Sequence, residues 1–256
     1  MSPRACILLR PGPTYRPEAF AAGAKRLGYD VLTRPLQLPR ESDVLIIWNR
    51  SRQHDPLARK FEEAGASVII AENGPTGADM NGRKLYSLSL SYHNGAGWHR
   101  AGADPRFEIP LQPWRAAGEH ILILPQRGIG SPPVAMPYGW LARTTKAIDN
   151  KRPVRIRHHP GAAKTHPQAD LDGAHCVVTW ASGAAIKAIL AGIPAFYDMP
   201  LWIGASAARQ FGADLENPFM GERAELVRQL SWLQWTAAEI QSGEALEWLL
   251  HDRRLS

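Results

Sequence analysis

The chain has 256 residues, a net charge of +6 and a sequence pI of about 9.5. Hydrophobic residues make up 45% and charged residues 21%, which excludes a disordered chain and allows one large domain or two small ones. No apolar run approaches the roughly 20 residues of a membrane span, and Pro11 breaks the N-terminal apolar run too early for a signal peptide, so we expect a cytoplasmic protein. The positive charge favours anionic partners such as nucleotides, anionic glycans or DNA.

The first half of the chain alternates short apolar runs with amphipathic segments. Apolar runs predict strands at 5–10, 29–33, 43–48 and 67–71, and spacing of apolar residues predicts helices from Pro17 to Gly28 and over 56–64. This β-α-β-β-α-β order predicts an α/β half with a largely parallel sheet. Cys6 lies in the first of these strands and reads as a core residue.

Residues 75–118 have a different character, being rich in Gly, Asn, His, Trp and Pro. They hold a possible strand at 86–92 and a polar loop at 93–98, and long irregular stretches of this kind are often functional. We place the domain boundary near residue 115, which predicts an N-terminal α/β domain (1–115), a second α/β domain (116–215) and C-terminal helices (216–256).

The second half repeats the α/β pattern. We expect strands at 120–124, 153–157, 176–180 and 195–197, helices at 139–148 and 185–191, and two amphipathic helices over 223–250. Cys176 falls in a predicted buried strand, so it is read as core rather than as half of a disulfide or metal pair. No HExxH or CxxC spacing appears, so the predicted site is metal-independent, and the absence of a GxSxG elbow argues against a hydrolase.

The turn at 181–184 is the centre of the second half. It separates a predicted buried strand from a helix and contains only small residues. Free backbone N–H groups at such a helix N-terminus can bind a phosphate or carboxylate. A plain strand-helix-strand crossover, with small residues for close packing, explains the same pattern.

Parallel sheets bind ligands beyond the carboxyl ends of their strands. The predicted strands end in polar or Gly-rich loops at 49–52, 72–74, 127–131, 157–161, 179–183 and 198. We therefore expect two α/β halves facing a cleft. The later half would contribute cationic groups, namely Arg127, Arg157, His158 and His159, and the earlier half Glu72 and His93.

Two of these loops could bind a phosphate. Arg127, Gly128, Gly130 and Ser131 could cradle a phosphate with an Arg fork and backbone amides, although a tight turn after a strand has the same sequence. Pro160 would hold His159 toward the ligand, where its imidazole could donate a hydrogen bond to a phosphate oxygen. The alternative is a histidine that faces solvent.

Glu72 at a strand end could act as general base toward an acceptor hydroxyl, and His93 could take the same role. A capping or surface residue is the alternative for both. The neighbouring polar and aromatic residues would form the acceptor side: Asn49, Arg50, Asn73, Asn94 and Trp98. Trp side chains beside Gly or polar residues (Trp48, Trp98, Trp114, Trp140) could stack on sugars or bases, or pack at a domain seam.

These motifs resemble those of bacterial sialyltransferases and Kdo transferases. Glu72-Asn73-Gly74, His159-Pro160 and Thr179-x-x-Ser182-Gly183 are similar to the acidic, HP and paired-hydroxyl motifs of those families, in the same order. The stretch Ser182-Gly183…Ala188…Gly192-x-Pro194 also resembles capsule-polysaccharide transferases. Asn73 replaces the second acidic residue, and Thr179 is displaced from the usual hydroxyl pair.

The resemblance implies a GT-B fold: two Rossmann-like halves facing a cleft, with C-terminal helices packing across them. It also implies an acceptor-side domain (1–115) and a donor nucleotide-binding domain (116–215). Within them, Glu72 would be the base, His159 would contact the nucleotide and Ser182 would contact the phosphate. Thr179 and Gly183 belong to the same motif and are further candidates for that contact. The co-substrate would be a UDP- or CMP-sugar, with no covalently bound cofactor.

Several short stretches, including QRGIGS and RHHPG, are also similar to glycosyltransferase-like proteins of tailed phages, which implies hydroxymethylated pyrimidines in phage DNA as an acceptor. Three alternatives stay open: a phage DNA-hypermodification transferase that adds a non-sugar group such as an amino acid, a capsule or cell-surface polysaccharide transferase, and a non-catalytic binding module.

Overall fold

The computed structural model describes residues 2–93, 96, 100–115, 117–132, 134–148, 152–159, 167–212 and 214–251. Asn94, Trp98 and Pro160, named above as site candidates, lie outside these residues. The chain forms two compact units, unit 1 (Met1–Ala101 and Trp232–Ser256) and unit 2 (Gly102–Ser231). The changes between units therefore fall at 101/102 and 231/232, whereas the sequence-based division placed them at 115/116 and 215/216.

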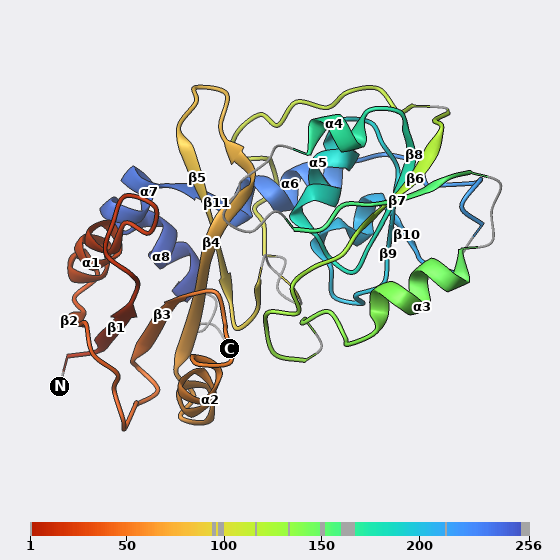
Figure 1. The fold of residues 1–256 in the computed structure, drawn as a ribbon. Coiled ribbons are helices and arrows are strands. Elements are labelled where there is room, and N and C mark those ends of the chain that lie inside the picture. Colours follow the sequence, from red (N-terminus) through yellow and green to blue (C-terminus); the bar gives the residue numbers. More distant parts are fainter. Residues whose placement is uncertain are drawn as a thin grey trace. The chain divides into compact units, whose positions relative to one another are not determined.

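Unit 1 contains a six-stranded mixed sheet (Figure 1). Its order is β11 (Gln234–Thr236), β5 (Lys84–Leu90), β4 (Ser67–Ala78), β3 (Val44–Trp48), β1 (Arg4–Leu8), β2 (Asp30–Leu32). The four strands from β4 to β2 are parallel, and β5 and β11 are antiparallel to their neighbours. The first four residues of β3, Val-Leu-Ile-Ile, are buried, as expected for an inner strand of a parallel sheet.

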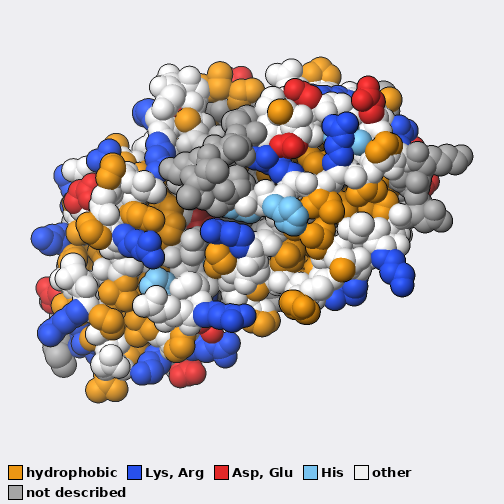
Figure 2. Space-filling model, viewed as in Figure 1, with side chains coloured by type: hydrophobic (Ala, Val, Ile, Leu, Met, Phe, Trp, Pro, Cys, Tyr) orange, Lys and Arg blue, Asp and Glu red, His pale blue; other side chains and the backbone are white. Residues whose placement is uncertain are grey.

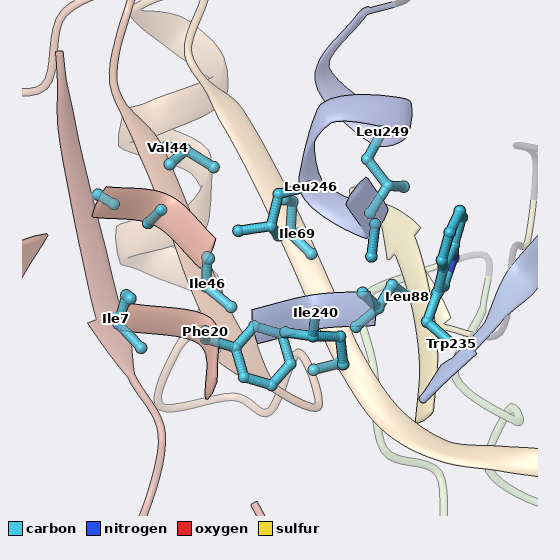
Figure 3. Close-up of a cluster of buried hydrophobic side chains, with 14 of the residues drawn as sticks. Ile7, Phe20, Val44, Ile46, Ile69, Leu88, Trp235, Ile240, Leu246 and Leu249 are labelled. Atoms are coloured by element: carbon cyan, nitrogen blue, oxygen red, sulfur yellow. The ribbon is translucent and has the colours of Figure 1, made fainter. Parts of the chain in front are cut away.

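Helices cover both faces of this sheet. One face carries α1 (Pro17–Arg26), α7 (Ala237–Ser242) and α8 (Glu244–His251), whose side chains Phe20, Ile240 and Leu246 pack on Ile46 and Ile69 (Figure 3). The other face carries α2 (Asp55–Glu63), whose Ala58 and Phe61 join a separate cluster with alternate residues of the same strands. Each fully buried aliphatic or aromatic side chain contributes about 1.5–3 kcal/mol.

Unit 2 contains a five-stranded parallel sheet. Its order is β10 (Arg209–Gln210), β9 (Ala195–Tyr197), β8 (Ala174–Thr179), β6 (His120–Leu124), β7 (Val154–Ile156). The helical segments are α3 (Trp140–Ala147), α4 (Gln168–Leu171), α5 (Gly183–Leu190), the 3-10 helix η3 (Ile203–Ala207) and α6 (Ala224–Leu233), whose last two residues belong to unit 1. The predicted α/β class with two Rossmann-like halves is confirmed. In the described part of the chain, no helix is both long and apolar enough to cross a membrane.

Two stretches differ from the sequence-based expectation. The expected two-helix tail contains three helices, and β11 interrupts them because Thr236 caps α7 through a reciprocal capping box with Glu239. The strand expected over 67–71 continues to Ala78, because β5 pairs with its second half. Glu72 therefore lies within a strand and not in a loop.

Candidate active site

The carboxyl edge of the unit 2 sheet has a topological switch point between β6 and β8. These strands are neighbours, but β6 is followed in sequence by β7 on one side and β8 by β9 on the other. The loops that leave them diverge, which opens space for a ligand in sheets of this order. Gln126 bridges the two loops by donating from Nε2 to the carbonyl oxygen of Ala181 at 3.0 Å.

Thr179 fixes the turn that follows β8. Its Oγ1 donates to the carbonyl oxygen of Leu124 on β6 and accepts from the backbone N–H of Ser182, both at 2.9 Å. Its side chain is fully buried. Thr179 can therefore act on a ligand only through the turn that it positions.

The turn ends at the N-terminus of α5. Ser182 is the N-cap, and its Oγ accepts from the backbone N–H of Ala184 at 3.2 Å. No atom of the described residues lies within 4 Å of the position that a Cβ on Gly183 would take, apart from its chain neighbours and the backbone of α5. The predicted helix began at Ala185, and the true start at Gly183 follows from this cap. The first turn of α5 therefore offers backbone N–H groups and a hydroxyl with open space beside them.

The loop after β6 depends on its glycines. Gly128 and Gly130 have φ angles of 65° and 123°, in the region that favours glycine. Ser131 ends the loop and is 7% exposed, and its Oγ has no hydrogen-bond partner within the described residues. Gly128 and Gly130 shape the loop, while Arg127 at its start is exposed.

The charges of Arg127 and Arg157 act on the imidazole of His159. Partial burial, followed by the charges of Arg127 and Arg157, lowers the pKa of His159. Arg157 also pairs with Asp170 on α4, which offsets part of its charge. The charges of Arg127 and Arg157 thus reach His159, whereas His158, the fourth predicted cation, is exposed.

The tryptophans expected to be stacking platforms do not share one role. Trp140 is 2% exposed, and its Nε1 donates to Asp198 at 2.7 Å, so it belongs to the interior of unit 2. Trp48 packs edge-on against Tyr15 and Tyr86. Both tryptophans therefore pack within a single unit, which is neither the stacking role nor the domain-seam alternative.

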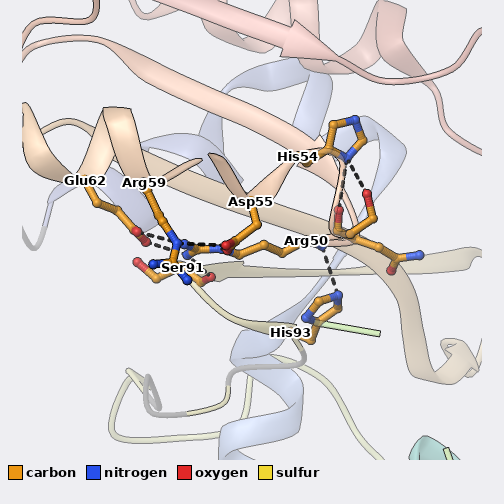
Figure 4. Close-up of polar contacts among 9 residues, drawn as sticks. Arg50, His54, Asp55, Arg59, Glu62, Ser91 and His93 are labelled. Carbon is orange, nitrogen blue, oxygen red and sulfur yellow. Dashed lines mark hydrogen bonds and ion pairs between the residues drawn. The ribbon is translucent and has the colours of Figure 1, made fainter. Parts of the chain in front are cut away.

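In unit 1, Arg50 connects α2 with the segment after β5 (Figure 4). Its guanidinium, 4% exposed, pairs with Asp55 at 2.7 Å and Glu62 at 2.6 Å, and donates to the carbonyl oxygen of Ser91 at 2.9 Å. Asn49, just before it, has φ of 56°, which Asn tolerates better than most residues. Arg50 was expected on the acceptor side, but its burial and two carboxylate partners show a structural ion pair.

His93 is bonded to the backbone beside this pair. Its Nε2 accepts from the backbone N–H of Arg50 at 3.0 Å, so the neutral ring carries its hydrogen on Nδ1. Burial, together with the charge of Arg50, lowers the pKa of His93 to about 4. The nitrogen that could take a proton is occupied, which disfavours His93 as a general base and leaves Glu72 as the stronger candidate.

Glu72 lies one residue beyond the point where β3 ends, since Trp48 pairs with Ala71. It shares the α2 side of the sheet with Val68 and Ile70, because side chains alternate along β4. Its direct partner on the neighbouring strand β5 is Ser87, and on the far side of β5 the residue opposite Ser87 is Gln234 of β11. Glu72, Ser87 and Gln234 thus form a polar row across three strands.

The other two residues of the Glu72 motif have different positions. Asn73 is exposed on the opposite side of β4. Gly74 lies against Gln234, whose Oε1 would be 2.6 Å from a Cβ placed there. That Oε1 accepts from both the N–H and the hydroxyl of Thr76. The glycine is therefore required by packing against Gln234.

Sequence reasoning missed Gln126, Ser87 and Gln234. The alternation Leu-Tyr-Ser-Leu-Ser-Leu in β5 was the available signal, since it places serines on one face. Within the described residues, no group of three or more His, Cys, Asp or Glu could hold a metal ion. Lys and Arg side chains are scattered over the face shown in Figure 2 rather than gathered in one stripe.

No family model matches the chain, and no curated protein matches it. Among solved structures, it is similar to the β Kdo 2,7 transferase KpsC of Thermosulfurimonas dismutans, with 11% identity and a TM-score of 0.54 over 95% of this chain and 99% of that one. The glycotransferase of kitacinnamycin is 14% identical, over 93% of this chain and 69% of that one, and its TM-score of 0.23 is too low to indicate a shared fold. The first similarity shows that this chain has a GT-B-like fold with two Rossmann-like α/β halves.

Proposed function

We propose that the protein is a glycosyltransferase that moves a sugar from a nucleotide-sugar donor, a UDP- or CMP-sugar, to an acceptor hydroxyl. The observation that carries the proposal is the edge of the unit 2 sheet. There the capped N-terminus of α5, the 127–131 loop and the cluster of Arg127, Arg157 and His159 surround a switch point. The similarity of the fold to that of a Kdo transferase over nearly the whole chain supports it.

Unit 2 would hold the donor phosphates. The backbone N–H of Gly183 and the hydroxyl of Ser182 suit a phosphate oxygen, since the N–H of Ser182 already donates to Thr179. Arg127 and Arg157 offset the charge that grows on the leaving phosphate. The bond from the anomeric carbon to that phosphate breaks as the acceptor oxygen bonds to the same carbon. Thr179 holds the turn in place through its two hydrogen bonds.

Unit 1 would supply the base. Glu72 would take the proton from the acceptor hydroxyl, so that the nucleophile develops negative charge only as the new bond forms. This role is supported by the place of Glu72 at the carboxyl end of the parallel strands and by the occupied Nε2 of His93. The reaction needs no metal ion in this scheme.

The acceptor we propose is anionic, because the chain carries a net charge of +6. Hydroxymethylated pyrimidines in phage DNA and a cell-surface glycan both supply a hydroxyl on an anionic polymer. They differ in salt dependence, since duplex DNA releases condensed counterions on binding.

The test is a titration of the purified protein with CMP-Kdo, CMP-sialic acid, UDP-glucose and GDP-mannose, followed by thermal unfolding. At least one donor should raise the unfolding temperature, and Arg127→Ala should reduce that shift. Mass spectrometry would then follow transfer to a duplex containing 5-hydroxymethylcytosine and to a Kdo-terminated glycan. Absence of a thermal shift and of transfer with every donor would refute the proposal.

A further inference from the structure

Ser87 is a buried hydroxyl for which the fold has no use. It is 0% exposed, and its Oγ has no hydrogen-bond partner in the described parts of the chain. An orphan buried hydroxyl costs free energy of folding, since it has lost its water and gained nothing in return. Native proteins keep few such groups, and those retained often serve a site.

Ser89 shows what the fold does with an equivalent hydroxyl. It lies on the same strand, faces the same side of the sheet and is also 0% exposed. Its Oγ donates to the carbonyl oxygen of Tyr92, which helps to hold the turn after β5. The two serines therefore differ in two respects: the Ser89 hydroxyl has a hydrogen-bond partner in the described residues and that of Ser87 has none, and a different residue of β4 is opposite each.

The residue opposite Ser87 is Glu72, whereas Ile70 is opposite Ser89. Direct partners across antiparallel strands have Cβ atoms about 4.5–5.5 Å apart. A serine hydroxyl and a glutamate carboxylate at that spacing come within hydrogen-bond reach after a change of side-chain rotamer.

We propose that Ser87 is a positioning residue for Glu72: its hydroxyl donates to the Glu72 carboxylate when an acceptor hydroxyl is bound, and so orients the oxygen that takes the proton. The inference rests on the proposed function. No atom is transferred to or from Ser87; the proton of the acceptor hydroxyl goes to Glu72. The hydroxyl is kept in the strand, at a cost to folding, because it is needed in that complex.

The comparison of Ser87→Ala with Ser89→Ala separates this role from a structural one. Ser87→Ala should unfold at the wild-type temperature or above it. Ser89→Ala should unfold at a lower temperature, because that substitution removes the hydrogen bond to the carbonyl oxygen of Tyr92. For the donor and acceptor that the wild type uses, Ser87→Ala should lower kcat roughly ten- to hundredfold, the worth of a hydrogen bond to a charged group. Ser89→Ala, measured below its unfolding temperature, should keep kcat within about twofold.

A pH profile supplies the second readout. A hydrogen bond to the ionised carboxylate favours that form, and here it forms only in the acceptor-bound enzyme. Its loss should therefore move the acidic limb of kcat, which reports the bound enzyme, to higher pH in Ser87→Ala. Wild-type kcat and an unchanged acidic limb in Ser87→Ala would overturn the inference while leaving the proposed function in place, and so would destabilisation equal to that of Ser89→Ala. Absence of transfer by the wild type itself would instead refute the proposed function, and the inference with it.

Discussion

The backbone N–H of Arg50 donates to Nε2 of His93 across 3.0 Å, joining the end of β3 to the segment after β5. The same Arg50 pairs through its side chain with two carboxylates of α2. One residue thus sets both the protonation state of His93 and the position of the chain that carries it. This arrangement holds the segment after β5 against the loop that follows β3.

Protonation of His93 should make stability depend on pH. Its pKa is about 4 in the folded protein and about 6.5 in an unfolded chain, so between these values the unfolded state binds more protons. The contribution of His93 to the free energy of unfolding, about 3 kcal/mol, is complete above pH 6.5 and is lost as the pH falls toward 4.

Urea denaturation at several pH values between 4 and 7 would measure this effect. His93→Gln keeps an acceptor for the Arg50 N–H but cannot titrate. Its stability should therefore fall less steeply than that of the wild type over the same range. Equal slopes for the two proteins would show that His93 is not the group responsible.

Removal of the Arg50 guanidinium should destabilise unit 1. Arg50→Met leaves Asp55 and Glu62 without their shared buried cation, and loss of one side of a buried ion pair costs about 3 kcal/mol. Arg59→Met is the matched control, because Arg59 also pairs with Asp55 but its side chain is 60% exposed, so its loss should cost less than about 1 kcal/mol. Equal losses in chemical denaturation would contradict the burial argument.

A methyl group at Gly183 should separate ligand binding from folding. The new methyl group of Gly183→Ala meets no atom of another described segment within 4 Å, and alanine is a better helix former than glycine. Stability should therefore stay unchanged or rise by up to about 1 kcal/mol. The methyl group would stand beside the N–H groups at the start of α5, and donor affinity should fall about tenfold or more. Calorimetric titration with CMP-Kdo or UDP-glucose measures this, and unchanged affinity for the bound donor would place the phosphate elsewhere.

Gly74→Ala should strain the contact between β4 and β11. Its Cβ would lie 2.6 Å from Oε1 of Gln234 and 3.0 Å from the carbonyl oxygen of Leu85, and overpacking of this kind costs about 1–3 kcal/mol. Asn73→Ala, one residue earlier and exposed, should change stability by less than about 0.5 kcal/mol. A thermal melt in which both variants match the wild type would show that Gln234 can move aside.

Strong local patterns made much of the fold predictable. The apolar runs at 44–48 and 120–124 are central strands, and Pro17 begins α1 as expected. The three residues of β11 were missed because a strand that short has no period of its own, and its place is set by pairing with β5. Local sequence could not show that pairing.

The part of the candidate site that depends on a turn could be predicted from the sequence. The part that depends on the pairing register of β4 and β5 could not. The capped start of α5 follows from small residues after a buried strand. The relation of Ser87 to Glu72 depends on which residues of β4 and β5 are opposite each other, and sequence spacing leaves that undetermined. Arg50 was assigned to the acceptor side because its position in a strand-end loop did not reveal its partners on α2.

Unit 1 is built from two separated stretches of chain, with all of unit 2 between them. During synthesis, residues 102–231 therefore leave the ribosome before β11, α7 and α8 exist, a delay of about ten seconds at ~5–20 residues per second. Throughout that time Phe20, Ile46 and Ile69 lack the apolar cover that Ile240, Leu246 and Leu249 will provide. We therefore expect chaperone binding or aggregation of this protein during that interval, when residues 1–101 have been synthesised and their apolar face is still uncovered.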